Sequence, residues 1–126
     1  MRARSPVLPV READWLATLI DTCRSLGYLV YHTHDSRRSA AGFPDLVAVN
    51  PFLHRVVFAE LKGPGGHLSL DQQRWRDALL EAGAAWYCWR PADWPEALRV
   101  LTASCADERT ESAPKAEPRT EGEAPP

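Results

Sequence analysis

Residues Arg55–Lys62 read RVVFAELK, a run of β-branched and aromatic residues that ends in two charges. This composition predicts a β-strand. Alternate side chains of a strand share a face, so Glu60 and Lys62 end a face that is otherwise apolar, and the opposite face is apolar from Val57 to Leu61. Such a strand is expected to be covered on both sides, where charge is costly unless it is paired or binds a metal. The strand end is therefore a candidate functional site, with an edge-strand ion pair as the alternative.

The flanking sequence predicts one small α/β domain. Its expected elements are, in order, a helix over 11–26, strands over 28–34, 45–50 and 55–62, a helix over 69–81, a strand over 84–89 and a helix over 93–101. Only a short turn separates the second and third strands, which predicts an antiparallel hairpin. The helix before the fourth strand has the length of a crossover, which predicts that the third and fourth strands are parallel. The result is a small mixed sheet flanked by helices.

The composition fits a single globular domain with a polar tail. Hydrophobic residues make up 44% of the 126 residues and charged residues 25%, with no apolar run of transmembrane length. The amino-terminal residues lack the apolar stretch of a signal peptide, so a cytoplasmic location is expected. Residues 1–7 are predicted to be disordered and residues 8–102 to fold. Residues 103–126, rich in Pro, Glu, Ser, Thr and Ala, are predicted to be a disordered acidic tail.

Charge and cysteine content exclude some functions and leave others open. The net charge is -2, but residues 103–126 carry six acidic and three basic residues, so residues 1–102 have a net charge of +1. That balance permits DNA binding without indicating it. Three widely spaced cysteines form no CxxC pair, which argues against a zinc site or a disulfide framework. No spacing of Ser, His, Asp or Cys indicates a metal-free hydrolase.

Asp45 follows Pro44 at the start of the second expected strand. In a hairpin the start of one strand lies beside the end of the other, so Asp45 is expected near Glu60 and Lys62. Two carboxylates with open coordination positions form a hard-oxygen site that suits Mg²⁺. A lysine beside them can hold an attacking water or stabilise charge on a phosphate. The alternative is that Asp45 is only a turn residue.

Two further polar residues could belong to the same site. Glu12 lies on the apolar face of the first expected helix, where it is either an inward-facing third acid of the site or a favourable charge at the helix N-terminus. Gln72 lies three residues after Ser69, so it could close a capping box, contact the site, or do both.

Together these stretches resemble the VRR-NUC (virus-type replication–repair nuclease) family of the PD-(D/E)xK nuclease superfamily. The segments GFPDL, AELK and LSxxQxxW carry the resemblance, which covers roughly residues 12–101. It implies a restriction-endonuclease-like αβββαβ core and hydrolysis of phosphodiester bonds with Mg²⁺, for which Mn²⁺ could substitute. The implied substrate is branched, junction or nicked DNA in replication, repair or recombination.

The resemblance also implies residue roles. The catalytic positions would be Asp45, Glu60, Lys62, Gln72 and Glu12. Asp45 and Glu60 would hold the metal with the backbone carbonyl of Leu61, and Lys62 would be the catalytic lysine. The DNA-facing residues would be His32, Arg37, Arg38 and His67. For the two arginines and His67, a solvated loop surface is the alternative.

The expected partners are DNA and a second copy of the chain, with neither a membrane nor an organic cofactor. The homodimer is expected because several apolar residues could exceed what the core needs, although all could be core: Trp86, Trp89, Trp94, Phe52 and Leu53. Two other interpretations stay open. One is a catalytically weak DNA-binding module that acts with a partner protein. The other is a toxin–antitoxin or protein-interaction module in which the tail is the working part.

Overall fold

The computed structural model describes residues 11–33 and 38–105. Its elements are, in order, α1 (Glu12–Ser25), β1 (Leu29–His32), β2 (Leu46–Asn50), β3 (Arg55–Leu61), α2 (Leu70–Glu81), β4 (Ala85–Trp89), the 3₁₀ helix η1 (Pro91–Asp93) and α3 (Trp94–Thr102). The predicted order of helices and strands is confirmed, and η1 is the only addition among the described residues. The predictions for residues 1–7, for Arg37 and for nearly all of the tail fall outside them.

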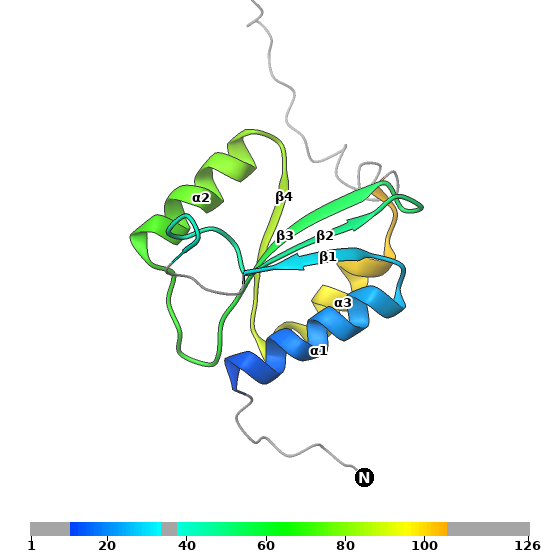
Figure 1. Cartoon of the computed structure of the whole chain (residues 1–126), viewed down its shortest axis with the longest axis horizontal. Coiled ribbons are helices and arrows are strands. Elements are labelled where there is room, and N and C mark those ends of the chain that lie inside the picture. Colours follow the sequence, from blue (N-terminus) through cyan, green and yellow to red (C-terminus); the bar gives the residue numbers. More distant parts are fainter. Residues whose placement is uncertain (1–10, 34–37, 106–126) are drawn as a thin grey trace, which may run out of the picture.

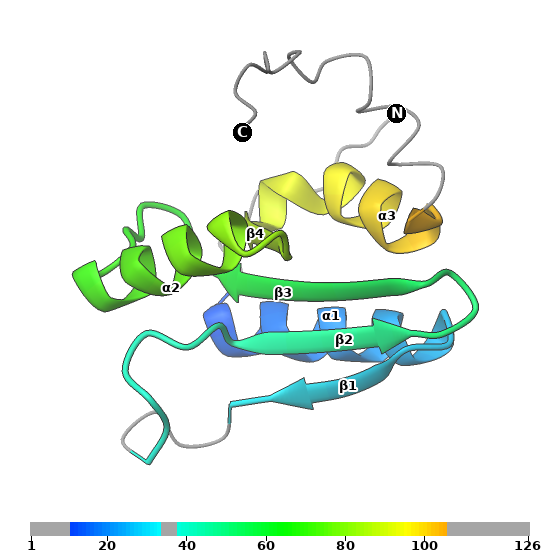
Figure 2. The same ribbon diagram turned by 90° about the horizontal axis from the view of Figure 1, so that it is seen from above.

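The four strands form one mixed sheet in the order β1-β2-β3-β4. β2 pairs antiparallel with both β1 and β3, and β3 pairs parallel with β4. The hairpin and the crossover through α2 are therefore both as predicted. α1 and α3 lie on one face of the sheet and α2 lies on the other (Figures 1 and 2).

The hydrophobic core lies between the sheet and the two helices α1 and α3. Its α1 residues recur at helical spacing and are Trp15, Leu19, Ile20 and Cys23. Alternate residues of β2 and β3 face these helices and are fully buried. Two aromatic side chains place their polar ends on backbone carbonyls, since Trp15 Nε1 donates to Trp89 at 3.0 Å and Tyr28 Oη donates to Leu101 at 2.9 Å. The polar atoms of both buried rings are therefore hydrogen-bonded, as buried polar atoms usually are.

The opposite face is covered at one end only. α2 lies over the carboxyl ends of β3 and β4, and none of its own residues is buried (Figure 2). At the other end, Val56 at the start of β3 is 45% exposed and Leu29 of β1 is 73% exposed. The prediction that β3 is covered along both faces is therefore wrong for its first half, because the single crossover helix covers β3 only at its carboxyl end.

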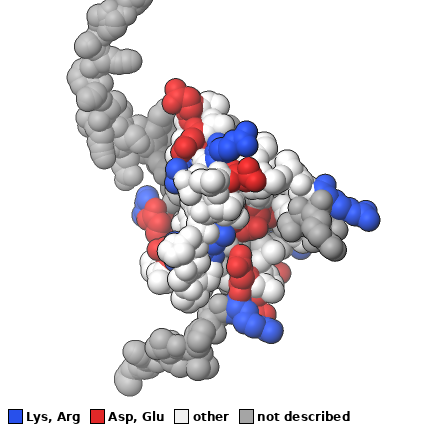
Figure 3. All heavy atoms as spheres, turned by 90° about the vertical axis from the view of Figure 1, so that its left-hand side faces the viewer, with Lys and Arg blue, Asp and Glu red and all other residues white. Residues whose placement is uncertain are grey.

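The end of the sheet under α2 collects several chain segments. β1, β3 and β4 finish there, and β2 begins there. Charges on this side of the molecule are mixed, with acidic and basic residues interspersed (Figure 3). Within residues 11–33 and 38–105, no helix is long and apolar enough to cross a membrane.

Candidate active site

Asp45 lies beside the last residues of β3. Its Oδ2 accepts a hydrogen bond of 2.8 Å from the backbone N–H of Leu61. The hairpin register explains this contact. Leu46 pairs with Ala59, so Asp45, the residue before Leu46, lies beside the residues that follow Ala59. The N–H and C=O of one strand residue point to the same side of the strand, so the Leu61 carbonyl also faces the Asp45 segment. The predicted approach of Asp45 to the end of β3 is therefore what the structure has.

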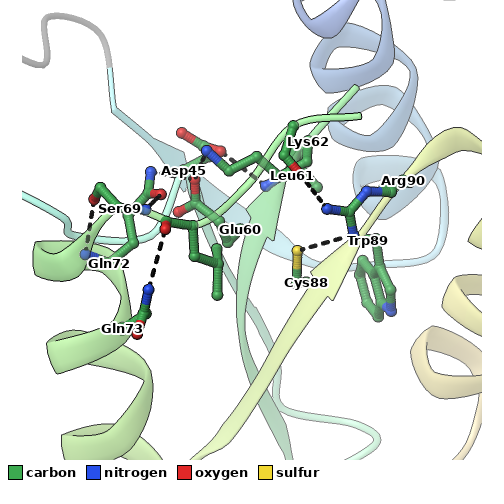
Figure 4. A network of polar contacts seen from close by, with 12 residues as sticks. Asp45, Glu60, Leu61, Lys62, Ser69, Gln72, Gln73, Cys88, Trp89 and Arg90 are labelled. Carbon is green, nitrogen blue, oxygen red and sulfur yellow. Dashed lines mark hydrogen bonds and ion pairs between the residues drawn. The ribbon is translucent and has the colours of Figure 1, made fainter. Parts of the chain in front are cut away.

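Glu60 is the charged residue at the centre of the site. Its side chain is only 2% exposed. Its Oε2 accepts a hydrogen bond of 2.7 Å from Gln72 Nε2 and lies 3.8 Å from Lys62 Nζ (Figure 4). Glu60 and Lys62 therefore pair at the end of a buried strand, with α2 closing over the carboxylate. They are not exposed residues of a sheet edge, since β3 has a neighbour on each side.

Burial and neighbouring charge change the protonation of this pair of acids. The pKa of Glu60 is raised from 4.5 to about 8, mainly by desolvation and also by the charge of Asp45 and a hydrogen bond with it. Lys62 acts in the opposite direction. Without a metal ion, burial and the neighbouring acid therefore favour the protonated form of Glu60. A cation placed between the two carboxylates would take over the role of that proton.

Gln72 has both of the roles that its position after Ser69 predicted. Its backbone N–H donates to Ser69 Oγ at 3.1 Å, and its Oε1 accepts from the Ser69 backbone N–H at 2.8 Å, which completes a capping box. The amide nitrogen of the same side chain then donates to Glu60. The capping box orients the side chain, and the N-terminus of α2 is in this way tied to the end of β3.

Glu12 is the first residue of α1, and its side chain is exposed. The prediction that it faces inward is wrong, because α1 begins at this residue and its apolar stripe starts only at Trp15. The charge of Glu12 still acts on the site, because it makes the smallest of the contributions that raise the pKa of Glu60. Its place in the first turn also fits the favourable interaction with the helix N-terminus.

Arg90 is a neighbour of the site that sequence reasoning missed. It follows β4, and its guanidinium donates to the backbone carbonyl of Gly66 (Figure 4). Gly66 packs on the stem of Lys62, because a Cβ added there would lie 3.3 Å from Lys62 Cδ. The predicted parallel pairing of the third and fourth strands could have indicated that Arg90 lies near Lys62. Leu61 pairs with Trp89, so the residues that follow the two strands lie side by side.

The predicted DNA-facing residues lie on segments around the two carboxylates. His32 ends β1 opposite Leu46 and is half-buried, while Arg38 and His67 are exposed on the loops before Asp45 and after Lys62. Arg37 lies outside the described residues. The structure therefore brings the described members of this set to the same end of the sheet as the acids.

The donors that could hold a metal ion are few. In the described part of the chain, no group of three or more His, Cys, Asp and Glu side chains is arranged to hold a metal ion. The oxygen atoms available beside one another are the carboxylates of Asp45 and Glu60 and the carbonyl of Leu61. A cation there would complete its coordination with water or with a ligand.

Comparison with known proteins identifies the class to which this arrangement belongs. Residues 13–92 match the VRR-NUC domain, and the chain belongs to this family. The family resemblance inferred from the motifs and the predicted α/β class are thereby confirmed.

Three relatives are informative. The Fanconi-associated nuclease 1 homolog of Caenorhabditis elegans is 45% identical over 47 residues, which are 37% of this chain and 5% of that protein. The homolog of Caenorhabditis briggsae is 43% identical over 47 residues, which are again 37% of this chain and 5% of that protein. A solved structure described as a VRR_NUC domain has a TM-score of 0.52 at 23% identity and covers 61% of this chain and 81% of its own, which shows a shared fold. The match spans about a twentieth of the length of the two curated relatives.

Proposed function

We propose that this chain is a metal-dependent DNA nuclease whose Mg²⁺ site is formed by Asp45 and Glu60. The observation that carries the proposal is the convergence of two acids and Lys62 at one end of the sheet of a VRR-NUC domain. The names of the two curated relatives, which describe them as nucleases, support the same activity.

The donor set suits Mg²⁺ better than a structural metal. Mg²⁺ is usually bound through one or two carboxylates and keeps water and substrate phosphate as its other ligands. Asp45, Glu60 and the Leu61 carbonyl would provide three oxygen atoms and leave open positions. Gln72 and Lys62 both engage Oε2 of Glu60, so Oε1 is the oxygen that remains for a cation. Mn²⁺, which accepts the same ligands, is expected to substitute.

In the proposed reaction a water attacks a DNA phosphate in line with the leaving oxygen. The ion, when bound, lowers the pKa of a water and neutralises phosphate charge. Lys62, held close to Glu60, orients the attacking water and offsets charge that develops on the phosphate. Gln72 keeps the Glu60 carboxylate in place during these steps. His32, Arg38 and His67 hold flanking phosphates, which fixes the position of the DNA without reading its bases.

We also propose that the substrate is branched, junction or nicked DNA in replication, repair or recombination. The support is the name of the two curated relatives, Fanconi-associated nuclease 1 homolog. A second candidate function is a catalytically weak DNA-binding module of the same fold that acts with a partner protein. Among the described residues, acidic and basic side chains are interspersed on the side shown in Figure 3, which favours a domain that needs help to bind DNA tightly.

We propose, finally, that the chain works as a homodimer, but through a surface other than the one expected. Trp89 is buried in the core and Trp94 packs edge-on against Trp15 at 5.8 Å, so these tryptophans are not spare surface. Phe52, in the turn between β2 and β3, is 83% exposed. Of the apolar residues predicted to be available for a dimer contact, Phe52 is therefore the one that the structure most clearly leaves exposed.

The uncovered end of the sheet offers the dimer surface instead. Leu29, Val49 and Val56 form one cross-strand row on the outer face, and all three are exposed. β1, with the sequence LVYH, is an edge strand. It contains no Lys, Arg, Asp, Glu or Pro that would prevent pairing with the edge strand of a second copy. A two-fold axis here joins identical surfaces and leaves both candidate sites at the outer ends. Light scattering at micromolar concentration tests it, since a mass of 14.1 kDa with and without DNA would exclude the dimer.

A cleavage panel tests the proposed activity. Purified chain is incubated with a four-way junction, a flap, a nicked duplex and a linear duplex, each with MgCl₂ or with EDTA. We expect cleavage of at least one branched or nicked substrate with Mg²⁺ and none with EDTA. DNA binding without cleavage under every condition would instead favour the catalytically weak module.

A further inference from the structure

The residues just before Asp45 are attached to α2. Trp75 Nε1 donates a hydrogen bond of 3.1 Å to the backbone carbonyl of Ala41. The ring of Phe43 lies edge-on against Trp75, with centroids 5.0 Å apart, and edge-on against Phe58 of β3 at 6.4 Å. The segment that carries Asp45 is therefore held by its side chains to a helix and to the central strand.

Gly42 brings the backbone of this segment directly against the helix. It has a φ of +85°, and a Cβ added to it would lie within 3.0 Å of the Asp71 backbone, closer than Cβ atoms come in proteins. Only glycine fits both the conformation and the space. The approach is thus a backbone-to-backbone contact that a side chain would force apart.

The same turn of α2 also holds the second acid. Gln72, which donates to Glu60, comes one residue after Asp71 and one helical turn before Trp75. One short stretch of helix therefore fixes both carboxylate-bearing segments. This connection matters because two acids that approach each other repel when both are ionised.

The far side of the segment is held by Thr33, whose backbone N–H donates to the Asp45 carbonyl at 3.0 Å and whose Oγ1 donates to the Pro44 carbonyl at 3.2 Å. A surface hollow of about 630 Å³ opens between the loop and the helix, lined by Ala41, Asp71, Arg74, Trp75, Asp77 and Ala78. The attachment to α2 itself is made by the hydrogen bond of Trp75, the ring contact of Phe43 and the close approach of Gly42.

We infer that Trp75 and Gly42 are positioning residues, which hold the Asp45 segment on α2 so that Asp45 and Glu60 keep the spacing needed for one cation. Neither residue touches the reacting atoms. Their effect on cleavage rests on the proposed function, whereas their effect on the position of Asp45 does not.

The backbone amide of Leu61 reports this position without any metal or substrate, because it donates to Asp45 Oδ2. Amide hydrogen exchange of the full chain in EDTA, followed by NMR, compares Trp75→Phe and Gly42→Ala with the wild type. Trp75→Phe keeps an aromatic ring and removes the N–H. Val57, in the middle of β3 and fully buried, is the internal reference. Gly83→Ala is the matched control, because Gly83 has a φ of +91° with nothing within 4 Å of an added Cβ.

We expect exchange at Leu61 to be about tenfold faster in Gly42→Ala and several-fold faster in Trp75→Phe, as for the loss of one hydrogen bond. Val57 in these variants should exchange as in the wild type, and Gly83→Ala, which has the strain of a positive φ without the close approach, should affect Leu61 no more than Val57. Unchanged exchange at Leu61 in both variants would overturn the inference. Equal acceleration at Leu61 and Val57 in both would also overturn it, because the contacts would then stabilise the fold as a whole.

A metal titration links the position of Asp45 to the site. Both variants should need a higher Mg²⁺ concentration than Gly83→Ala for half-maximal cleavage, and their Mn²⁺ affinity, measured by electron paramagnetic resonance, should fall in parallel. If the wild type cleaves no DNA, the proposed function fails while the exchange result still decides the positioning role. Faster Leu61 exchange with unchanged Mn²⁺ affinity would overturn the link to the metal.

Discussion

The two faces of the sheet differ in how completely they are covered. The face under α1 and α3 is closed and mostly apolar, with Leu46, Val57 and Leu61 fully buried and with Asn50 and Arg55 as its buried polar residues. The face under α2 is closed at one end only, and there it buries Glu60 against Gln72. The closed face supplies the stability, and the half-open face carries charge that is costly to bury. Changes on the two faces should therefore separate stability from activity.

The largest expected effect is loss of cleavage from the half-open face. Asp45→Asn should lower turnover on the order of a thousandfold, because it removes ligand charge and keeps the side-chain volume. Asp14→Asn is the matched control, since Asp14 is an exposed acid in the first turn of α1. Cleavage of the preferred substrate in Mg²⁺ is the measurement. Wild-type turnover in Asp45→Asn would reject the site.

Lys62→Ala should lower kcat about a hundredfold and change DNA affinity little, because one lysine is a small part of phosphate binding. Arg99→Ala, in α3, serves as the control for loss of a positive charge elsewhere. Single-turnover cleavage and fluorescence anisotropy measure the two quantities. An affinity loss as large as the loss in kcat would make Lys62 a binding residue only.

A change on the closed face should lower stability and leave cleavage nearly unchanged. Leu19→Ala removes a fully buried side chain and should cost about 2–5 kcal/mol of unfolding free energy. The melting temperature should fall by about 10 °C or more in a domain of this size. Cleavage measured well below that temperature should stay near the wild-type rate. Loss of cleavage in the folded variant would mean that the two faces are not separable.

The pH dependence of stability gives the smallest effect. Glu60 has a pKa of about 8 in the folded chain against an ordinary value of 4.5, so the folded state binds more protons between these values. Without metal, stability should fall as pH rises from about 4.5 to about 8. Glu60→Gln should remove this decline and melt about 4 °C or more above the wild type at pH 8 in EDTA. Glu81→Gln, at an exposed acid that ends α2, is the control, and an equal gain there would exclude burial as the cause.

Much of the fold follows from local patterns in the sequence. The strand RVVFAELK, the short turn before it and the crossover helix after it determine the sheet topology and bring Asp45 to Glu60. The capping box that aims Gln72 could also be predicted, because Ser69 and Gln72 have the required spacing.

Other features depend on contacts that no local pattern encodes. Val56 is exposed because α2 covers only the carboxyl end of β3, and helix periodicity does not give that position. The start of α1 at Glu12 leaves that acid exposed, although it falls on the apolar stripe of a longer helix. Trp75 looks like an ordinary inward aromatic residue in the sequence, and only the fold pairs its N–H with Ala41.

The most direct test of the metal site is anomalous diffraction from crystals of the chain soaked in Mn²⁺. We expect one strong peak between the carboxylates of Asp45 and Glu60, beside the carbonyl of Leu61, and no such peak in crystals of Asp45→Asn. A peak at other residues in a protein that still cleaves DNA with Mn²⁺, or a peak unchanged by Asp45→Asn, would refute the assignment of the site.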